Sequence, residues 1–157
     1  MAGIVGEPRS YDKKFLFGVE IDDLDIGWFE SISAIEEETG VVEQHSGGSH
    51  LVEDQSPGKT KWTPVTLAYG ITKNTELYDW RQKVVRSGAN SGEPDASYKK
   101  NLAIIQKDRD GTEKGRWTLY EAWPSKCVWG EWDAKAEENV IGQVTLTYKY
   151  AEYTRTA

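Results

Sequence analysis

Alternation of apolar and polar side chains with a period of two runs through most of this chain, and no other feature limits its fold as strongly. The segment from Val140 to Tyr150 is the clearest example. Because successive side chains of a strand point to opposite faces, such a segment predicts a strand with one buried and one solvated face. The apolar face would carry Val140, Val144, Leu146, Tyr148 and Tyr150. The polar face would carry Gln143, Thr145, Thr147 and Lys149.

The same alternation predicts further strands elsewhere in the chain. They span residues 15–21, 28–38, 62–69, 98–107, 116–123 and 127–133, and Val41 with Val42 extends the second or begins another. Asp110-Gly111 supplies the positive-φ positions of a tight turn, so the segments on either side of it are predicted to form a hairpin. The stretch from Gln44 to Lys61 has no usable period and is predicted to be a long loop, which in a compact domain is usually functional or mobile.

One segment, Thr75 to Ser87, has the pattern of a helix. Leu77, Trp80, Val84 and Val85 would share one face and pack on a sheet. Gly88 is well placed to end this helix. Residues 1–157 are therefore predicted to form a single domain. Its class is mainly antiparallel β, a sandwich or barrel of about seven or eight strands with one packed helix.

The charge and cysteine content exclude several classes of protein. Nineteen basic against 26 acidic residues give a net charge of −7, which argues against a nucleic-acid reader. The single cysteine, Cys127, can form no intramolecular disulfide, so a reducing compartment is expected. The N-terminus does not have the pattern of a signal peptide, and no stretch is long and apolar enough to span a bilayer. We expect a soluble, cytoplasmic protein.

The residues that could carry chemistry are poorly arranged for it. His45 and His50 lie in a glycine-rich stretch that does not bring their imidazoles to one face for a metal. Glu36 and Glu38 could serve a glycosidase, which needs two carboxyl groups across a cleft, but the run 36–38 alternates between strand faces. Cys127 is interpreted as a packed residue because no catalytic histidine lies near it in sequence. We predict neither an enzyme nor a metal or cofactor site.

Seven tryptophans make the apolar content strongly aromatic. Trp28 and Trp80 are expected in the core, and Trp62 and Trp123 at interfaces with other chains. A platform of stacked tryptophans is the alternative interpretation. It would make the chain a Trp-rich β-sandwich that binds carbohydrate.

Two segments join a turn-forming residue to a tryptophan and a lysine, Pro57 to Trp62 and Ala122 to Lys126. Proline closes a strand or protects its edge, and tryptophan gives a large, rigid contact surface. Both segments therefore suit a strand end or loop that meets another surface. The predicted interface residues are Pro57, Gly58, Lys59, Lys61, Trp62, Trp123, Pro124 and Lys126.

Five segments in this order resemble the tail tube (inner tube) protein family of contractile phage tails and phage-tail-like injection systems. They are Gly27-Trp28-Phe29-Glu30-Ser31-Ile32-Ser33, Pro57-Gly58-Lys59 leading to Val65-Thr66-Leu67-Ala68-Tyr69-Gly70, Leu77-Tyr78-Asp79-Trp80, Lys99-Lys100-Asn101-Leu102-Ala103-Ile104, and Ala122-Trp123-Pro124-Ser125-Lys126. The resemblance covers nearly the whole chain. Ala34 departs from the family pattern where a glycine is expected, and Gly142-Gln143 departs from it where a glutamate is common.

The resemblance implies a structural subunit that forms hexameric rings. The rings would stack into a rigid tube whose inner wall is a β-barrel of strands from all six subunits, which makes the predicted polar strand face a candidate lumen wall. Its partners would be further copies of itself, a contractile sheath, baseplate or hub proteins and a tube terminator, with DNA or an effector as cargo. Assembly would occur in the bacterial cytoplasm. Whether the machine is a phage tail, an extracellular particle or a membrane-anchored system is left open.

Overall fold

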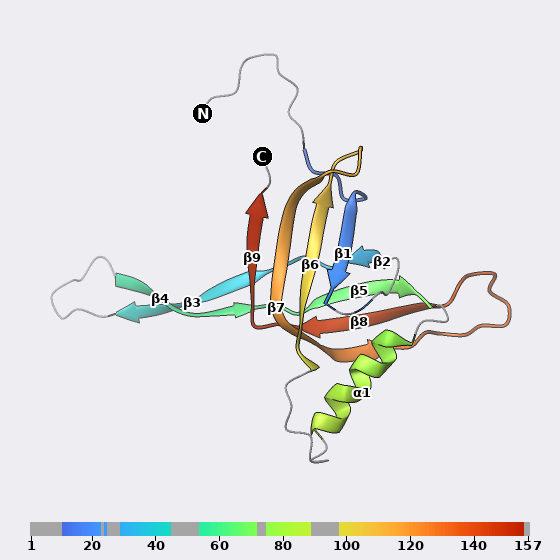
Figure 1. Cartoon of the computed structure of the whole chain (residues 1–157). Coiled ribbons are helices and arrows are strands. Elements are labelled where there is room, and N and C mark those ends of the chain that lie inside the picture. The colour runs from blue at the N-terminus through green and yellow to red at the C-terminus, as the bar shows by residue number, and fades with distance from the viewer. Residues whose placement is uncertain are drawn as a thin grey trace.

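The computed structural model describes residues 11–22, 24, 29–44, 54–71, 75–88 and 98–155 of the chain. These residues form nine strands and one helix, and the predicted class, mainly antiparallel β with one packed helix, is confirmed (Figure 1). In chain order the elements are β1 (Phe17–Ile21), β2 (Phe29–Ile32), β3 (Glu37–Gln44), β4 (Asp54–Trp62), β5 (Val65–Gly70), α1 (Glu76–Gly88), β6 (Lys100–Lys107), β7 (Glu113–Val128), β8 (Ile141–Thr147) and β9 (Tyr150–Arg155).

Strand β7 is 16 residues long and belongs to two groups of strands. Its N-terminal part pairs with β6 and β9, and β6 pairs with β1, so these four strands make a first half-sheet. Its C-terminal part pairs with β8, which continues to β5 and β2 and makes a second half-sheet. In Figure 1 the strands of the two half-sheets run across one another, and α1 lies beside the second.

A bulge at Glu121 bends β7 between the half-sheets. Glu121 has a φ of 54°, and the register with β6 shifts between Lys100 and Leu102. The prediction of a separate strand at 127–133 is therefore wrong: β7 runs through the corner to Val128, and residues 129–133 are not in a strand. A bulge lets a strand change direction without losing its pairing, and alternation alone does not reveal it.

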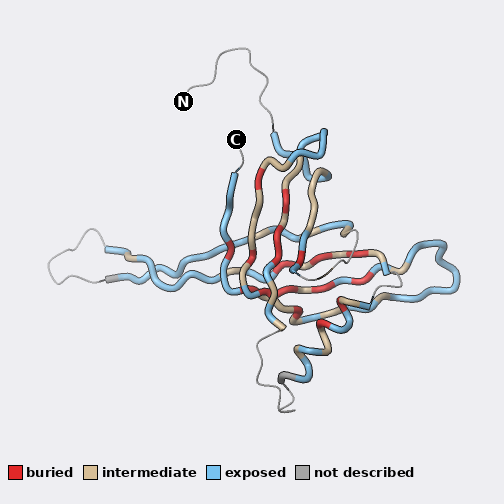
Figure 2. The backbone as a smooth tube through the Cα atoms, viewed as in Figure 1, coloured by how far each residue is buried: buried red, intermediate tan, exposed pale blue. Residues whose placement is uncertain are grey.

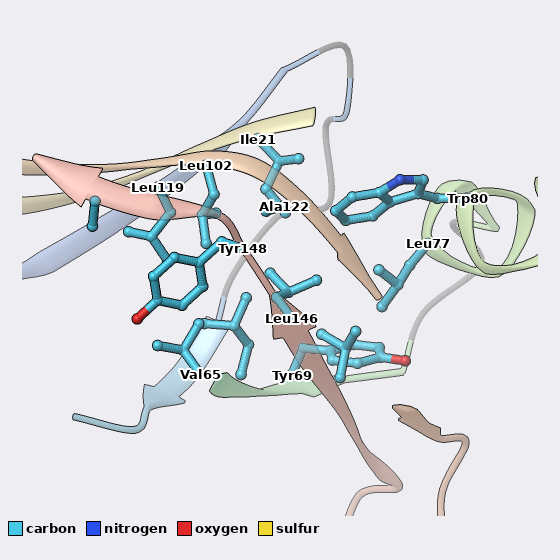
Figure 3. Close-up of a cluster of buried hydrophobic side chains, with 13 residues drawn as sticks. Ile21, Val65, Tyr69, Leu77, Trp80, Leu102, Leu119, Ala122, Leu146 and Tyr148 are labelled. Carbon is cyan, nitrogen blue, oxygen red and sulfur yellow. The ribbon is translucent and has the colours of Figure 1, made fainter. Parts of the chain in front are cut away.

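The core lies between the two half-sheets and α1 (Figure 3). Val65, Leu67 and Tyr69 alternate with less buried residues along β5, as the period-two pattern predicted. The predicted helix is confirmed to within one residue at each end, and it buries Trp80, which is 1% exposed. Val85 was expected on the packed face but is 46% exposed, because it lies at the margin of the apolar stripe.

The stretch predicted to be a long loop is partly a strand. Asp54–Trp62 forms β4, which pairs with β3 in a two-stranded sheet of its own. We call this β3–β4 ribbon the arm; it projects away from the half-sheets, and Figure 2 shows it almost entirely exposed. Because both faces of the arm are solvated, its sequence need not alternate, so the pattern was missing. The predicted strand at 28–38 is likewise divided into β2 and β3 where the chain leaves the sheet for the arm.

The predicted strand from Val140 to Tyr150 also divides in two. β8 ends at Thr147, and Tyr150 begins β9, which returns along β7. Tyr148 lies between them and is buried, and its hydroxyl donates a 2.8 Å hydrogen bond to the carbonyl of Thr63. The Lys149 amide donates to the carbonyl of Tyr120 on β7 at 3.0 Å, just before β9 begins its pairing with that same strand.

Candidate assembly surfaces

One face of the second half-sheet carries a row of hydroxyl groups. The hydroxyls of Thr66 on β5 and Thr145 on β8 lie 3.1 Å apart. Thr147 donates a 3.0 Å hydrogen bond to the Ser125 hydroxyl, which in turn donates to the carbonyl of Thr145 at 3.2 Å. These four residues are the hydroxyl row. Since its hydroxyls bond mainly to one another and to the backbone, the row makes a polar, uncharged and rigid surface.

Three of the four predicted polar-face residues share one face of β8, and the fourth, Lys149, lies outside the strand. Gln143 is exposed, and Thr145 and Thr147 are half-buried, all at alternate positions of β8. Lys149 lies beyond the end of β8, where its ammonium is 3.7 Å from the Glu121 carboxylate. Thr66 and Ser125 were not predicted to belong to this face, although the alternation of Thr66 with Val65 and Leu67 was a usable signal.

The second half-sheet has two open edges. Within the described residues, no strand pairs with the outer edge of β2 or with the outer edge of residues 123–128 in β7. At the β7 edge, the Arg81 guanidinium of α1 donates a 2.8 Å hydrogen bond to the carbonyl of Pro124. Open edges can pair with strands of another chain, and a proline carries no N–H for such pairing. A strand of another chain therefore cannot form backbone hydrogen bonds at Pro124, but it can pair with the residues of β7 that follow Pro124.

The predicted interface residues on the arm are of two kinds. Pro57, Gly58, Lys59 and Lys61 are exposed. Trp62, by contrast, is half-buried at the base of the arm, where its ring centroid lies 6.5 Å from that of Trp117 and 6.0 Å from that of Tyr148. Its aromatic neighbours lie within the same chain, so it joins the arm to the core.

The predicted interface residues in β7 also divide. Pro124 is fully buried, and the ring of Trp123 packs edge-on against Tyr98 with the centroids 6.4 Å apart. Lys126 is exposed. Of these three residues, Lys126 alone has a side chain free to reach far from the surface of the subunit.

The described residues do not form a catalytic or metal site. Glu36 and Glu38 are both exposed at the base of the arm, and among the described residues no three histidine, cysteine or acidic side chains gather to hold a metal ion. His45 and His50 lie outside the described residues. Cys127 is half-buried, and burial raises the pKa of its thiol, which lowers its reactivity.

The tryptophans give no support to a sugar-binding platform. Trp80 is buried as predicted, and Trp62 and Trp117 pack against each other. Trp129 packs on Tyr78 with the ring centroids 5.4 Å apart. Trp28 lies outside the described residues. In the part of the chain that is described, no helix is long and apolar enough to cross a membrane.

A family model identifies the family of this chain, and solved structures show its fold. Residues 13–152 match the family model of the T4-like virus tail tube protein gp19. A sequence search of curated proteins finds no match.

Among solved structures, the chain is similar to a protein in the anti-feeding prophage tube terminating cap, with a TM-score of 0.79, 20% identity, and coverage of 96% of this chain and 95% of that one. It is also similar to a protein in the sheath–tube complex of an extracellular contractile injection system, PVC, in the extended state, with a TM-score of 0.76, 23% identity, and coverage of 97% and 95%. Hcp1 from Flavobacterium johnsoniae is more distant, with a TM-score of 0.52, 15% identity, and coverage of 90% and 97%. At these identities the likeness shows a shared fold.

Proposed function

This chain belongs to the T4-like virus tail tube protein gp19 family, and from that membership we propose that it assembles into the inner tube of a contractile injection particle or phage tail. Copies of the chain join in hexameric rings, and the rings stack into a rigid hollow tube. The chain acts by assembly and not by catalysis.

The observation that carries this proposal is the architecture of the second half-sheet. Its apolar face is buried in the core, its other face carries the hydroxyl row, and no described strand pairs with either of its two outer edges. A head-to-tail contact that joins one edge to the opposite edge of the next copy generates a ring if the rotation closes. Closure removes both open edges, and the polar faces then line a channel.

Gln143, Thr145 and Thr147 are the proposed lumen residues, and Lys149 lies at the margin of this surface. Lys126, opposite Thr145 in the β7–β8 register, adds one positive charge to this face, while the proposed lumen residues of β8 carry only hydroxyl and amide groups. A wall with so little charge holds DNA or an acidic effector weakly, so such cargo can pass. Cysteine labelling tests whether a residue faces the lumen, and the native thiol is first removed by Cys127→Ser so that only the introduced cysteine reacts. Gln143→Cys should react with a small maleimide in assembled tubes but not with a bulky polyethylene-glycol maleimide, while Lys83→Cys on α1 should react with both. Equal labelling of both sites by the bulky reagent would contradict the lumen assignment.

The exposed arm residues Pro57, Gly58, Lys59 and Lys61 are proposed to contact a neighbouring copy, as is Lys126 beyond the corner. Trp62, Trp123 and Pro124 support these contacts from inside the subunit. Lys59→Glu combined with Lys61→Glu reverses two charges on the arm and should weaken stacking, which would shorten the tubes.

A matched double variant, Lys83→Glu with Lys135→Glu, reverses two exposed charges away from the arm and should leave tube length unchanged. Unchanged tube length in the Lys59→Glu, Lys61→Glu variant would show that the arm does not take part in stacking.

The proposed partners are a contractile sheath, baseplate or hub proteins and a tube terminator. Proteins of the same fold occur in a baseplate structure, a sheath–tube complex and a sheath–tube terminator structure, which supports these three classes of partner. We propose that sheath contraction drives the tube through a target membrane. Assembly takes place in the bacterial cytoplasm, and the finished particle is either a phage tail or a particle released from the cell.

Negative-stain electron microscopy of the purified chain, with its solution mass measured alongside, tests the proposal most directly. Rings with sixfold symmetry, or tubes built from them, are the expected result. A species that stays monomeric even with sheath and baseplate partners present would overturn the proposal.

A further inference from the structure

The outer edge strand β2 contains a β-bulge. Its register with β5 shifts between Phe29 and Ser31. Glu30 and Ser31 therefore lie against the single residue Ala68, and two residues against one define a bulge. Phe29 and Ile32, on either side of the bulge, pack against the core. Glu30 and Ser31 are exposed, so the side chains of β2 follow the order core, polar, polar, core.

The opposite edge, at the end of β7, has a bulge of the same kind. The register with β8 shifts after Pro124, which sets Ser125 and Lys126 against a single residue of β8. Pro124 is fully buried, and Cys127 packs against the core. Lys126 is exposed, and the Ser125 hydroxyl belongs to the hydroxyl row. The order along this edge is again core, polar, polar, core.

The two edge strands run in opposite directions. β2 is antiparallel to β5, β5 to β8, and β8 to β7, so β2 and the end of β7 are antiparallel to each other across the half-sheet (Figure 1). When the β7 edge of one copy meets the β2 edge of its neighbour, as in the proposed ring, the two strands can form an antiparallel pair.

A single register of that pair keeps all four side chains of each edge on the correct face. It sets Glu30 of one copy opposite Lys126 of its neighbour, and Ser31 opposite Ser125. The end of β2 then lies beside Pro124, where a partner strand forms no backbone hydrogen bonds. Within the described part of the chain, neither the Glu30 carboxylate nor the Lys126 ammonium has an ion-pair partner.

We propose that Glu30 of one copy and Lys126 of the next form an ion pair at every seam of the ring, and that this pair sets the register in which the two edges join. The inference rests on the proposed function and deepens it, because it names the residues that decide how copies are aligned. Opposite charges directly across an antiparallel pair stabilise it, and like charges destabilise it. Complementary charge fixes register and rejects wrong partners more than it adds affinity.

Charge reversal with rescue tests the ion pair. Rings are counted in electron micrographs under conditions in which the wild-type chain forms them, with sheath and baseplate partners added if they are required. Glu30→Lys alone or Lys126→Glu alone places like charges at every seam, and each should give about tenfold fewer rings. The double variant restores opposite charges and should return to the wild-type yield. Both positions are exposed, so we expect the variants to fold, as circular dichroism and thermal unfolding would verify.

A matched pair of control variants makes the same changes of charge outside both edges. Lys135→Glu and Glu138→Lys lie in the exposed segment between β7 and β8. Each should leave ring formation unchanged, which separates an effect at the seam from an effect of net charge.

Disulfide trapping tests the register itself. In a Cys127→Ser background, Glu30→Cys with Lys126→Cys should link neighbouring copies in rings oxidised with copper phenanthroline, because bridged cysteines have Cα atoms within about 7 Å. Within one copy, β5 and β8 separate the two positions by about 14 Å, so the bond must join two copies. Ser33→Cys with Lys126→Cys is displaced by about 10 Å along the strand and should stay reduced.

Single charge variants that form rings at wild-type yield would overturn the inference, and so would a double variant that recovers no rings. Stronger cross-linking through Ser33→Cys than through Glu30→Cys would overturn it as well. All three results leave the tube proposal in place. If the wild-type chain forms no rings with its partners present, the tube proposal fails, and this inference fails with it.

Discussion

The ring of Tyr69 lies directly over Gly142 on the neighbouring strand. The two residues are paired in the β5–β8 register, and a Cβ added to Gly142 would lie 2.7 Å from Cζ of Tyr69. Tyr69 is 7% exposed and packs edge-on against Phe29 with the ring centroids 6.3 Å apart, so it has little room to move. This contact gives a physical reason for the glycine in Gly142-Gln143, the pair that departs from the family pattern where a glutamate is common.

Gly142→Ala should therefore destabilise the fold. Forcing a methyl group into this site shifts a buried ring, and overpacking of this kind costs about 1–3 kcal/mol. Gly70→Ala is the matched control, because it lies on the strand paired with β8 and an added Cβ there meets nothing within 4 Å. Urea unfolding of both variants measures the difference, and similar losses in the two would show that Tyr69 yields easily.

The backbone at Glu121 leads to a second prediction. A φ of 54° is in the left-handed region, which costs a residue with a Cβ about 1–2 kcal/mol relative to glycine. Glu121→Gly and Glu121→Ala both lose the exposed ion pair with Lys149, so their difference reports on the backbone alone. The glycine variant should be more stable than the alanine variant by about 1 kcal/mol, after allowance for the greater freedom of glycine in the unfolded chain. Equal stability in urea unfolding would mean that β7 changes conformation at the bulge.

Strands and helices with one buried face could be predicted from the sequence. β5 and α1 follow their apolar periods because Leu67 and Trp80 are held in the core, and burial imposes the pattern. The Asp110-Gly111 turn was likewise predictable, since Gly111 has a φ of 88°, a conformation that favours glycine.

Elements without a buried face could not be predicted in this way. The arm is solvated on both sides, so no period marks β4. At the corner of β7, the Glu121 amide donates a 3.3 Å hydrogen bond to the side-chain oxygen of Asn101, which lies on the adjacent strand β6. This contact joins two residues 20 positions apart in the sequence. Pro124 is fully buried, and its carbonyl accepts a hydrogen bond from Arg81, which is distant in sequence. Relationships of this kind appear only when the chain is folded.

Trp80 is the side chain whose removal should cost the most. It is 1% exposed, and its indole N–H donates a hydrogen bond to the carbonyl of Tyr98. Trp80→Ala should destabilise the protein by about 3–5 kcal/mol, because it opens a large cavity and leaves that carbonyl without its partner. Val85→Ala, on the same helix but 46% exposed, should stay within about 0.5 kcal/mol of the wild type. A small effect of Trp80→Ala in urea unfolding would mean that α1 is not fastened to the core.

A bidentate ion pair joins the N-terminal segment to the last strand and predicts a dependence of stability on pH. The Arg155 guanidinium donates to the two carboxylate oxygens of Asp12 at 2.8 Å and 3.2 Å, and Lys114 lies 3.6 Å from the same carboxylate. The hydrogen bond from Arg155 is the main reason that the pKa of Asp12 lies below its ordinary value of 3.8. A carboxyl group with a lowered pKa in the folded state stabilises the fold above its ordinary pKa, and this contribution is lost as the pH falls through the folded value.

Arg155→Gln should therefore lower the melting temperature at pH 7, and the gap to the wild type should close as the pH falls below the ordinary carboxyl value of 3.8 and through the lowered pKa of Asp12. The effect should be small because the pair is exposed, and it should weaken in high salt. Arg109→Gln, in the exposed turn after β6, is the matched control and should melt like the wild type at every pH. Melting curves of the three proteins between pH 2 and pH 7 decide the matter, because a gap that persists at the lowest pH would show that Arg155 acts through packing and not through the charge of Asp12.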